Sequence, residues 1–293
     1  MTQGIIIKAL SGFYYIESDG VIYQTRARGV FRKRGQSPLV GDVVEFESSN
    51  LQEGTLTKIN PRKNAIVRPP VANVDVGIIV MSAVEPEFST HLVDRFLVYL
   101  EGLDVHPVIM ITKTDLLDVA GMSRLVDVKA RYEKIGYPVY FGQEVMKDKA
   151  PLLESLRGEK VIFLGQSGVG KSTLLNEMIP ELNQETGEIS NALGRGRHTT
   201  RHVSLHEIEG VWIADTPGFS TVDFMEIEKE DLPHLFPEFV EVEHECKFRE
   251  CSHQHCAVIA GVESGDIWQE RYDHYLSFYE ELDQRKPVYK RKK

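Results

Sequence analysis

The chain has 293 residues, enough for two or three small domains, and its 42% hydrophobic and 27% charged content is ordinary for a globular protein. No apolar run approaches the roughly 20 residues that a membrane span requires, and the N-terminus lacks the basic segment and cleavage site of a secretory leader. We therefore expect a cytoplasmic protein with no membrane partner. The net charge of −10 argues against a nucleic-acid partner for the chain taken as a whole.

Short strands separated by turns are predicted for residues 1–70, with Asp19-Gly20 and Gly41-Asp42 as turn signals. The runs of β-forming residues are Ile5–Ile7, Phe13–Glu17, Val21–Thr25, Val43–Glu47 and Gly54–Ile59. Five such runs in so short a segment predict a small β-barrel of the OB-fold type. The segment holds ten Lys or Arg against six Asp or Glu, so its local charge is +4 and differs in sign from the remainder.

A basic run lies between two of these strands and contains one aromatic residue, Phe31. Barrel loops of this composition contact phosphates and stack bases, so we predict an RNA-contacting loop. The alternative is a solvated loop without a partner. The predicted RNA-binding residues are Arg26, Arg28, Phe31, Arg32, Lys33 and Arg34.

The segment Arg68-Pro69-Pro70 predicts a linker, because proline fixes φ and removes backbone donors. Beyond it, apolar strands alternate with helices, a pattern typical of a parallel sheet covered on both faces. The predicted strands are Val74–Ala83, Val105–Thr112, Tyr137–Phe141, Lys160–Leu164 and the pair Val203–Ile208 and Val211–Ala214. The predicted helices are His91–Glu101 and one that begins with Ser172–Met178, and the last seventy residues are expected to be helical and irregular.

The segment after the second of these strands has the pattern of a guanine-reading motif, TKTD, made by Thr112, Lys113, Thr114 and Asp115. The Asp115 carboxylate would accept hydrogen bonds from guanine N1–H and the 2-amino group, a pattern that adenine does not offer. Thr112 stands where such motifs usually have Asn and lacks its amide donor, a loss of about 1–3 kcal/mol. We expect GTP to be preferred with modest affinity; the alternative is a plain turn at a strand end.

A phosphate loop, GQSGVGKS, follows the strand Lys160–Leu164 and opens a helix. Its glycines let backbone N–H groups wrap a phosphate, and the helix adds its positive end. Lys171 would reach the β- and γ-phosphates and act in catalysis, and the Ser172 hydroxyl would ligate Mg²⁺. The loop residues predicted to bind the nucleotide are Gly165, Gln166, Ser167, Gly168, Val169, Gly170, Lys171, Ser172 and Thr173.

Two later segments complete the predicted magnesium site. Asp215 begins an Asp-x-x-Gly motif after a strand, where it would hold Mg²⁺ while the Gly218 amide contacts the γ-phosphate. The loop GRGRHTTR, residues 194–201, offers Thr199 and Thr200, of which Thr200 is the predicted third magnesium ligand; the alternative is a basic surface loop without this role. We expect this loop to become ordered when nucleotide binds.

The residues that would position the attacking water are less well defined by the pattern. Many GTPases place a Gln directly after the Asp-x-x-Gly motif, but here the residue is Phe219, which cannot orient water. His198, in the 194–201 loop, is the candidate for that role, and a surface histidine without a role fits the pattern equally well. We expect slow intrinsic hydrolysis and a partner that completes the site.

The order of these motifs is itself informative. In an ordinary small GTPase the phosphate loop comes first and the base-reading motif comes late. Here TKTD precedes the phosphate loop by some fifty residues. We predict a circularly permuted P-loop GTPase domain over residues 71–222, after an OB-fold RNA-binding domain over 1–70. Its last motif leads directly into residues 223–293.

All three cysteines lie in an eleven-residue run, CKFRECSHQHC, from Cys246 to Cys256. An odd number of cysteines so close together is a poor disulfide framework and a fair metal site. Three thiolates and one imidazole would suit a structural, tetrahedral Zn²⁺, with His253 and His255 both available. The alternative is a set of reduced, buried thiols. We predict a helical zinc-binding domain over residues 223–293.

With permuted GTPase motifs behind a small barrel and ahead of a Cys/His run, the chain resembles the RsgA family over essentially its whole length. The motifs that carry the resemblance are TKTD, GQSGVGKST, GRGRHTTR, DTPGF and CKFREC. The resemblance implies a multidomain α/β protein with an OB-fold, a permuted GTPase domain and a helical zinc domain. It also implies a monomeric cytoplasmic enzyme that hydrolyses GTP to GDP and phosphate with Mg²⁺ and carries one Zn²⁺.

The resemblance further implies a role late in maturation of the small (30S) ribosomal subunit, contact with its 16S rRNA near the decoding region, and a GTPase stimulated by that subunit. The zinc ligands carry over as Cys246, Cys251, His253 and Cys256. Two departures stand out. The family usually has a longer insertion before the last Cys, whereas only Gln254 and His255 intervene here, which leaves His255 as an alternative ligand. The final Ser-Ala motif that contacts guanine is not recognisable near 140–143, so no base contact is assigned there.

Two other functions fit parts of the pattern. A metallochaperone GTPase would combine the phosphate loop with the Cys/His run and predicts an exchangeable metal, whereas a structural zinc resists mild chelation. An RNA-binding module with a non-catalytic nucleotide predicts no turnover even when its partner is present. The basic barrel disfavours the metallochaperone and does not separate the RNA module from the GTPase.

Overall fold

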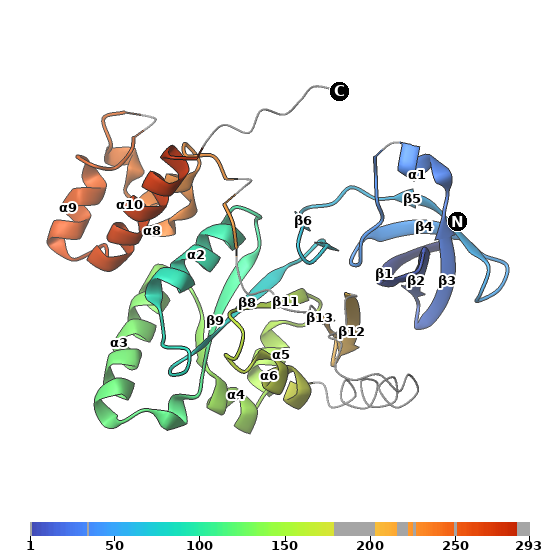
Figure 1. The fold of residues 1–293 in the computed structure, drawn as a ribbon, viewed down its shortest axis with the longest axis horizontal. Helices are drawn as coiled ribbons and strands as arrows, with labels where there is room; N and C mark the ends of the chain where they lie inside the picture. The colour runs from blue at the N-terminus through green and yellow to red at the C-terminus, as the bar shows by residue number, and fades with distance from the viewer. Residues whose placement is uncertain are drawn as a thin grey trace.

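The computed structural model describes residues 2–33, 35–178, 203–215, 222–224, 227–248 and 251–285. Along the chain, a β-barrel is followed by an α/β unit and then by a helical unit, and the α/β unit lies between the other two (Figure 1). Within the described ranges, none of the helices has the length and apolar character that a bilayer crossing requires.

The N-terminal unit is a closed barrel of five strands, as the sequence predicts. Its strands are β1 (Thr2–Leu10), β2 (Phe13–Ser18), β3 (Val21–Ala27), β4 (Val43–Glu47) and β5 (Gly54–Ile59). The first three form an antiparallel meander, β3 pairs in parallel with β5, and β4 closes the barrel by pairing with both β5 and β1. The alternating apolar residues Ile6, Ile16, Val44 and Leu56 fill the interior and are fully buried.

The basic run between β3 and β4 differs from the expectation in two respects. Residues Gly29–Lys33 form the short helix α1, not a loop. Phe31 is only 5% exposed and belongs to the apolar core, so its predicted role in stacking RNA bases is wrong. An aromatic ring gains more from filling the barrel end than from staying in water. Arg26 lies over the Phe13 ring, with its guanidinium carbon 4.4 Å from the ring centroid, and Arg28 pairs with Glu47.

The remaining predicted RNA-contacting residues are Arg32, Lys33 and Arg34. Lys33 is exposed, and Arg34 and the side chain of Arg32 lie outside what the structure describes. The cations of this run that the structure places on the surface are therefore Arg26, Arg28 and Lys33.

The predicted linker at residues 68–70 is instead the turn of a short hairpin. Strand β6 (Ala65–Ile66) pairs antiparallel with β7 (Val71–Ala72) on either side of it. The hairpin is fixed to the barrel, because Asn73 donates to the Gly41 carbonyl at 3.0 Å and Arg62 makes an ion pair of 2.6 Å with the buried Asp42. Strands of two residues are too short to produce a recognisable sequence pattern, so the prolines alone predicted a linker.

The central unit is built on the parallel strands β10-β9-β8-β11-β13, with β12 antiparallel at the edge beside β13. The bounds are β8 (Val76–Ser82), β9 (His106–Thr112), β10 (Val139–Phe141), β11 (Lys160–Leu164), β12 (Ser204–Ile208) and β13 (Val211–Asp215). The strand that leads into the phosphate loop, β11, is thus flanked by β8 and β13. A single bridge between Lys8 of β1 and Ser204 of β12 joins the barrel to this sheet.

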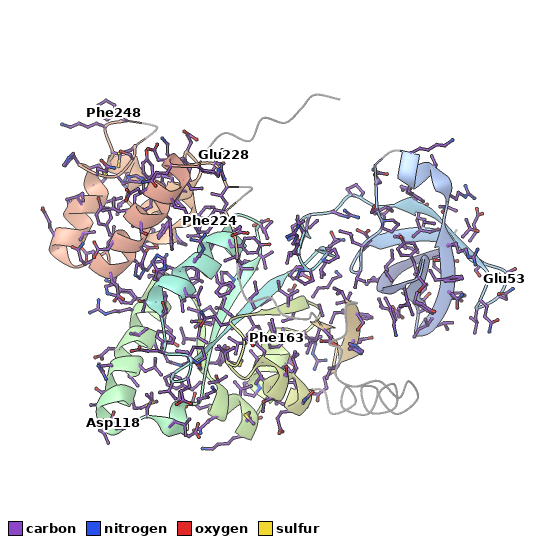
Figure 2. The ribbon with its side chains drawn as sticks, in the orientation of Figure 1. Glu53, Asp118, Phe163, Phe224, Glu228 and Phe248 are labelled. Atoms are coloured by element: carbon purple, nitrogen blue, oxygen red, sulfur yellow. The ribbon has the colours of Figure 1, made fainter. Side chains whose placement is uncertain are left out.

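Helices cover both faces of the sheet, which explains why every residue of β8 is buried. Successive residues of that strand contribute to different cores: Ile79 packs on the side of α2 and α3, and Ile78 packs on the side of α5 and α6 together with Phe163 (Figure 2). The helices are α2 (Thr90–Glu101), α3 (Val119–Ile135), α4 (Gly142–Lys147), α5 (Ala150–Ser155) and α6 (Lys171–Met178), with a 3₁₀ turn η1 at Thr114–Leu116.

The C-terminal unit is helical, as predicted, and surrounds a largely aromatic core. Its elements are η2 (Leu232–Leu235), α8 (Pro237–Val240), η3 (Glu243–Glu245), α9 (Ala257–Ser264) and α10 (Gln269–Asp283). Phe236, Phe239 and Tyr275 pack ring against ring, with centroids 4.9–5.4 Å apart. Val98 of α2 also belongs to this core, so the unit is docked on the central domain through α2.

A buried ion network crosses that contact. Arg271 of α10, which is fully buried, lies 2.6 Å from an Asp94 carboxylate oxygen of α2 and 2.5 Å from Glu238 of α8. The Tyr132 hydroxyl donates to Asp94 at 2.9 Å, and His274 Nδ1 lies 2.5 Å from the other Asp94 oxygen. Each charge is paired, which is the condition under which buried ions are tolerated.

We expect Asp94→Ala to lower the free energy of unfolding by about 3–5 kcal/mol, because it leaves the buried Arg271 guanidinium without one of its two carboxylates. Chemical denaturation followed by circular dichroism measures the change. The exposed Asp127 of α3 supplies the control, since Asp127→Ala should stay within about 0.5 kcal/mol of wild type. Equal stability of the two variants would show that the network does not hold the domains together.

Candidate functional site

The phosphate loop leaves β11 and enters α6 with a backbone that only glycine accommodates at its key positions. Gly165, Gly168 and Gly170 have φ values of 139°, 83° and 95°. A Cβ atom on Gly165 would lie 2.1 Å from the Val80 carbonyl oxygen of the neighbouring strand. The loop therefore passes so close to β8 that no side chain fits, and its backbone is left to face a ligand.

Lys171 begins α6, and its side chain folds over the loop that precedes it. The Nζ amine donates to the carbonyl of Gln166 at 2.6 Å and to that of Gly165. Partial burial lowers the pKa of Lys171, because the charged amine is taken out of water without a carboxylate beside it. A bound phosphate would supply the missing anion. Ser172 and Thr173 are exposed at the first turn of the same helix.

Thr112, at the end of β9, joins the base-reading motif to the phosphate loop. Its hydroxyl donates to the Val169 carbonyl at 2.5 Å and lies 3.2 Å from the Met81 carbonyl. Val169 is fully buried, so this part of the loop is held from two sides. The sequence pattern shows only that Thr112 lacks the amide of Asn, and it gives no sign of the hydrogen bond that the Thr112 hydroxyl makes. The contact arises because β9 and β11, which lie on either side of β8, end at the same edge of the sheet.

The rest of TKTD turns away from β9 into the 3₁₀ turn η1. Lys113 has φ 56°, in the left-handed region, and its Nζ donates to the Glu85 carbonyl. Thr114 is buried beneath the turn, whereas Asp115 is exposed, as a carboxylate that reads a base edge must be. Gly142, where α4 begins, also packs here, since a Cβ on it would lie 3.3 Å from the Thr112 methyl carbon. The segment near 140–143 thus lies beside the motif.

Asp215 ends β13, the parallel neighbour of β11, and so reaches the same edge of the sheet as the phosphate loop. It is partly buried, and burial raises the pKa of its carboxyl, partly offset by His206 on β12. A cation at this edge would favour the ionised form. The predictions for His198, Thr199, Thr200, Gly218 and Phe219 concern residues outside the described ranges, and they remain predictions.

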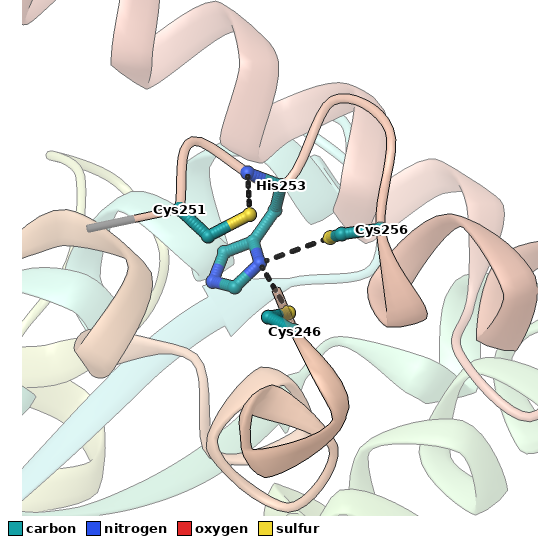
Figure 3. A group of neighbouring side chains, drawn as sticks. All are labelled: Cys246, Cys251, His253 and Cys256. Atoms are coloured by element: carbon teal, nitrogen blue, oxygen red, sulfur yellow. Dashed lines mark hydrogen bonds between the residues drawn. The ribbon is translucent and has the colours of Figure 1, made fainter. Parts of the chain in front are cut away.

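The Cys/His run folds into a compact cluster of four possible ligands, Cys246, Cys251, His253 and Cys256, whose ligand atoms all lie within 4.8 Å of one another (Figure 3). His253 Nδ1 is 3.7 Å from the Cys246 sulfur and 3.2 Å from the Cys256 sulfur. The His253 backbone N–H donates to the Cys251 sulfur at 3.4 Å. Three sulfurs and one imidazole nitrogen at this spacing fit a tetrahedral zinc ion.

The protonation chemistry of the cluster also fits a metal. Burial lowers the pKa of His253, which favours the neutral imidazole that a metal requires. Burial raises the pKa of Cys256 to about 12, and hydrogen bonding with the neighbouring Cys246 and Cys251 thiols contributes to the shift by favouring the protonated form. A divalent ion would stabilise the thiolates instead and deprotonate the thiols.

The loop that carries His253 is fixed by helix α10. The Tyr272 hydroxyl donates to the His253 carbonyl and the Tyr275 hydroxyl to the Ser252 carbonyl, both at 3.0 Å. His253 is 2% exposed and has φ 53°, so the chain reverses there and three residues suffice to reach Cys256. His255 is exposed and is not among the four, so this geometry does not support it as an alternative ligand.

The family models settle which fold family combines these parts. One, described as RsgA GTPase, matches residues 59–225, and another, described as RsgA N-terminal domain, matches residues 3–56. The chain belongs to the RsgA GTPase family. The family assignment, the permuted fold and the GTPase class predicted from the motifs are confirmed.

Relatives in the RsgA family span the whole chain. The chain is 51% identical over 292 residues to the small ribosomal subunit biogenesis GTPase RsgA of Streptococcus pyogenes serotype M3, covering 99% of this chain and 98% of that protein. Its identity to the Enterococcus faecalis protein of the same description is 53% over 294 residues, with the same coverage.

Solved structures agree with the observed fold. A structure described as YloQ, a circularly permuted GTPase, matches with a TM-score of 0.85 at 42% identity and covers 99% of this chain and 97% of that one. YjeQ from Thermotoga maritima matches with a TM-score of 0.83 at 31% identity, covering 97% and 99%. The permuted order of the motifs is therefore a property of the fold, and the chain is a GTPase.

We expect Gly165→Ala to weaken binding of a fluorescent GDP analogue by roughly tenfold or more, since the added methyl meets the Val80 carbonyl and the residue sits at φ 139°. Gly158→Ala is the matched control: that glycine also has a positive φ, 86°, but no heavy atom lies within 4 Å of its added Cβ. Equal binding by both variants would refute the close approach of the loop to β8.

Proposed function

We propose that this GTPase acts late in maturation of the small (30S) ribosomal subunit, in the cytoplasm and as a monomer, with hydrolysis stimulated by the subunit. The hydrogen bond from Thr112 to the Val169 carbonyl carries the nucleotide assignment, because it joins the base-reading motif and the phosphate loop into one site. The choice of the small subunit as the partner is supported by relatives that are described as small ribosomal subunit biogenesis GTPases and match over 98% of their length.

The nucleotide site then has an assigned role for each residue. Asp115 accepts from guanine, and the loop from Gly165 to Gly170 donates its N–H groups to the phosphates. Lys171 exchanges its bonds to the loop carbonyls for bonds to the β- and γ-phosphates, because the phosphates supply the anion that its partly buried ammonium lacks and would oppose the lowering of its pKa. Ser172, Thr200 and Asp215 would hold Mg²⁺, which supplies positive charge to the oxygens that gain negative charge during transfer.

Hydrolysis transfers the γ-phosphoryl group from the β-phosphate oxygen to water, and gives GDP and phosphate. His198 is the residue we propose for orienting that water, because Phe219 has no hydrogen-bonding group. Slow turnover without a partner is the expected consequence, since a side chain on a single loop must be placed by whatever the protein binds.

The barrel contributes the contact with 16S rRNA. Arg26, Arg28 and Lys33 are exposed and carry positive charge, in a segment, residues 1–70, whose net charge is +4. Arg32 and Arg34 extend the same run. With Phe31 in the core, these residues would act on the phosphate backbone, which gives salt-dependent affinity and no base selectivity.

The Cys/His cluster holds one Zn²⁺ in a structural role. The ligand loop is fixed to α10 by two tyrosine hydroxyls, and the ligand His253 is buried, so no coordination position is kept for an exchanging partner. This disfavours the metallochaperone alternative. The metal would contribute folding free energy on the order of 10 kcal/mol to a unit with a small core.

We expect purified small ribosomal subunits to raise steady-state GTP hydrolysis by roughly 10-fold or more, with ATP hydrolysis unchanged, because the partner places the water-orienting group. Lys171→Ala should abolish the stimulated rate. Hydrolysis that stays at the basal rate in the presence of subunits would reject this function and favour an RNA-binding module with a non-catalytic nucleotide.

We expect Cys251→Ser to lower the zinc content from about one equivalent to near zero and to reduce the thermal stability of the helical unit, because a tetrahedral site loses one of its thiolates. Elemental analysis and a thermal melt measure the two effects. His255→Ala is the control and should retain the metal, because His255 is exposed and outside the cluster. Loss of zinc from the control instead would identify His255 as a ligand.

A further inference from the structure

Between the nucleotide site and the helical unit, the chain passes from one core to the other within three residues. Val222 is 5% exposed and belongs to the core of the central domain, whereas Phe224 is 3% exposed and belongs to the aromatic core of the C-terminal unit. Asp223 between them is exposed. Figure 2 shows Phe224 beside α2, at the boundary of the two units.

We call residues 222–224 the crossing. The Arg95 side chain contacts the first and the last of these three residues. Arg95 of α2 donates from Nε to the Val222 carbonyl at 3.0 Å, and its guanidinium carbon lies 4.3 Å from the centroid of the Phe224 ring. The other two nitrogens of the same guanidinium donate to the two oxygens of Glu281, on α10, at 2.6 and 2.7 Å. A single planar group thus contacts the crossing chain and the C-terminal helix from the central domain.

A second arginine reinforces the position of Phe224. Arg285, just beyond α10, donates to the Phe224 carbonyl at 2.6 Å and pairs with Glu228 at 2.9 Å. The Phe224 ring meets Phe278 of α10 edge to face, with centroids 5.2 Å apart. The crossing is therefore fixed through its backbone and through its side chain, from elements of both units.

The crossing lies close to the metal end of the nucleotide site in sequence. Asp215 is seven residues before Val222, a stretch that can span at most about 25 Å when fully extended. A displacement of Asp215 on a change of nucleotide is either taken up within that short connection or transmitted to its anchored end at Val222. Strong anchoring at Val222–Phe224 favours transmission to α10.

We propose that Arg95 is a positioning residue that couples the nucleotide site to the C-terminal domain by clamping the Val222–Phe224 crossing between α2 and α10. The inference rests on the proposed function and adds that the GTP and GDP states bind the small subunit with different affinities. A planar guanidinium is needed because it donates to a carbonyl and to a carboxylate with its nitrogens and packs against an aromatic ring with its face. Lysine offers a single charged nitrogen and cannot satisfy this geometry.

The test measures the Kd of the protein for purified small ribosomal subunits with a non-hydrolysable GTP analogue and with GDP. The ratio of the two Kd values reports the coupling, and ratios of about 5 to 150 are typical of coupled sites. We expect Arg95→Ala and Arg95→Lys to bring the ratio close to one. Affinity for the nucleotide itself should stay within about twofold of wild type, because Arg95 does not contact the nucleotide site.

Arg131→Ala is the matched control. Arg131 of α3 also contacts the C-terminal unit, with its guanidinium carbon 5.2 Å from the Trp268 ring, but it does not touch the crossing, so the wild-type ratio should remain. Glu281→Gln provides a milder change if the arginine variants unfold: it removes the carboxylate charge, keeps the bond from Arg95 to Val222, and should reduce the ratio partially.

An Arg95→Ala protein that remains folded and keeps the wild-type ratio would overturn the proposal. A wild-type ratio close to one would also overturn it, because there would be no coupling for Arg95 to carry. In that case, stimulation of GTP hydrolysis by the subunit still decides the proposed function separately, because a subunit can activate turnover without distinguishing the two nucleotide states.

Discussion

Four parallel strands, β9, β8, β11 and β13, end at one edge of the central sheet, and the nucleotide site depends on that arrangement. The phosphate loop follows β11, TKTD follows β9, and Asp215 ends β13. Hydrogen bonding between strands brings these segments together although they come from distant parts of the chain. Ligands bind at the carboxyl ends of strands in open α/β sheets for this reason, whatever the order in which the strands occur. Circular permutation is compatible with function because it changes the connections and leaves this edge intact.

The permutation gives the magnesium-binding segment a different neighbour along the chain. Here β13 is the last strand in chain order within the described ranges, and Phe224, nine residues beyond its end, belongs to the core of the helical unit together with Val98 of α2. The contact between the two units includes buried charges, with Arg271, Asp94 and Glu238 paired out of water. Buried ion pairs contribute little net stability, but removing one partner is costly, so they disfavour any other docking arrangement. A contact of this kind suits two units that must keep a defined relative position.

In the helical unit, the Cys/His cluster and the small apolar core are part of the same packed interior. Aromatic rings, Phe239 and Tyr275 among them, and aliphatic side chains share its apolar interior, and these two rings also pack against His253. The Cys/His cluster is therefore not an appendage, because the ring that offers a ligand nitrogen is also part of the core. The hydroxyls of Tyr272 and Tyr275 fix the ligand loop from α10. Metal binding and aromatic packing stabilise the same segment of chain.

Periodicity and motif chemistry determined much of this protein from the sequence alone. The alternating residues of Val43–Glu47 and the apolar run Lys160–Leu164 predict strands with the observed bounds. The glycines of the phosphate loop and the Cys/His spacing predict their sites because a phosphate and a zinc ion each demand particular local groups. The permuted order followed from the positions of two motifs. All of these are properties that neighbouring residues encode together.

Contacts between distant segments were decided only by the tertiary structure. The basic residues around Phe31 in the sequence fit an RNA-stacking ring as well as a core ring. Only the folded barrel shows that Phe31 is buried. In the sequence, Thr112 is only a residue without the amide donor of Asn. In the structure, the end of β9 lies beside the phosphate loop, and the Thr112 hydroxyl donates to the Val169 carbonyl. Arg95 carries no motif, and its role follows from α2, α10 and the crossing chain meeting at one guanidinium. Such roles depend on three-dimensional proximity, which local sequence patterns do not record.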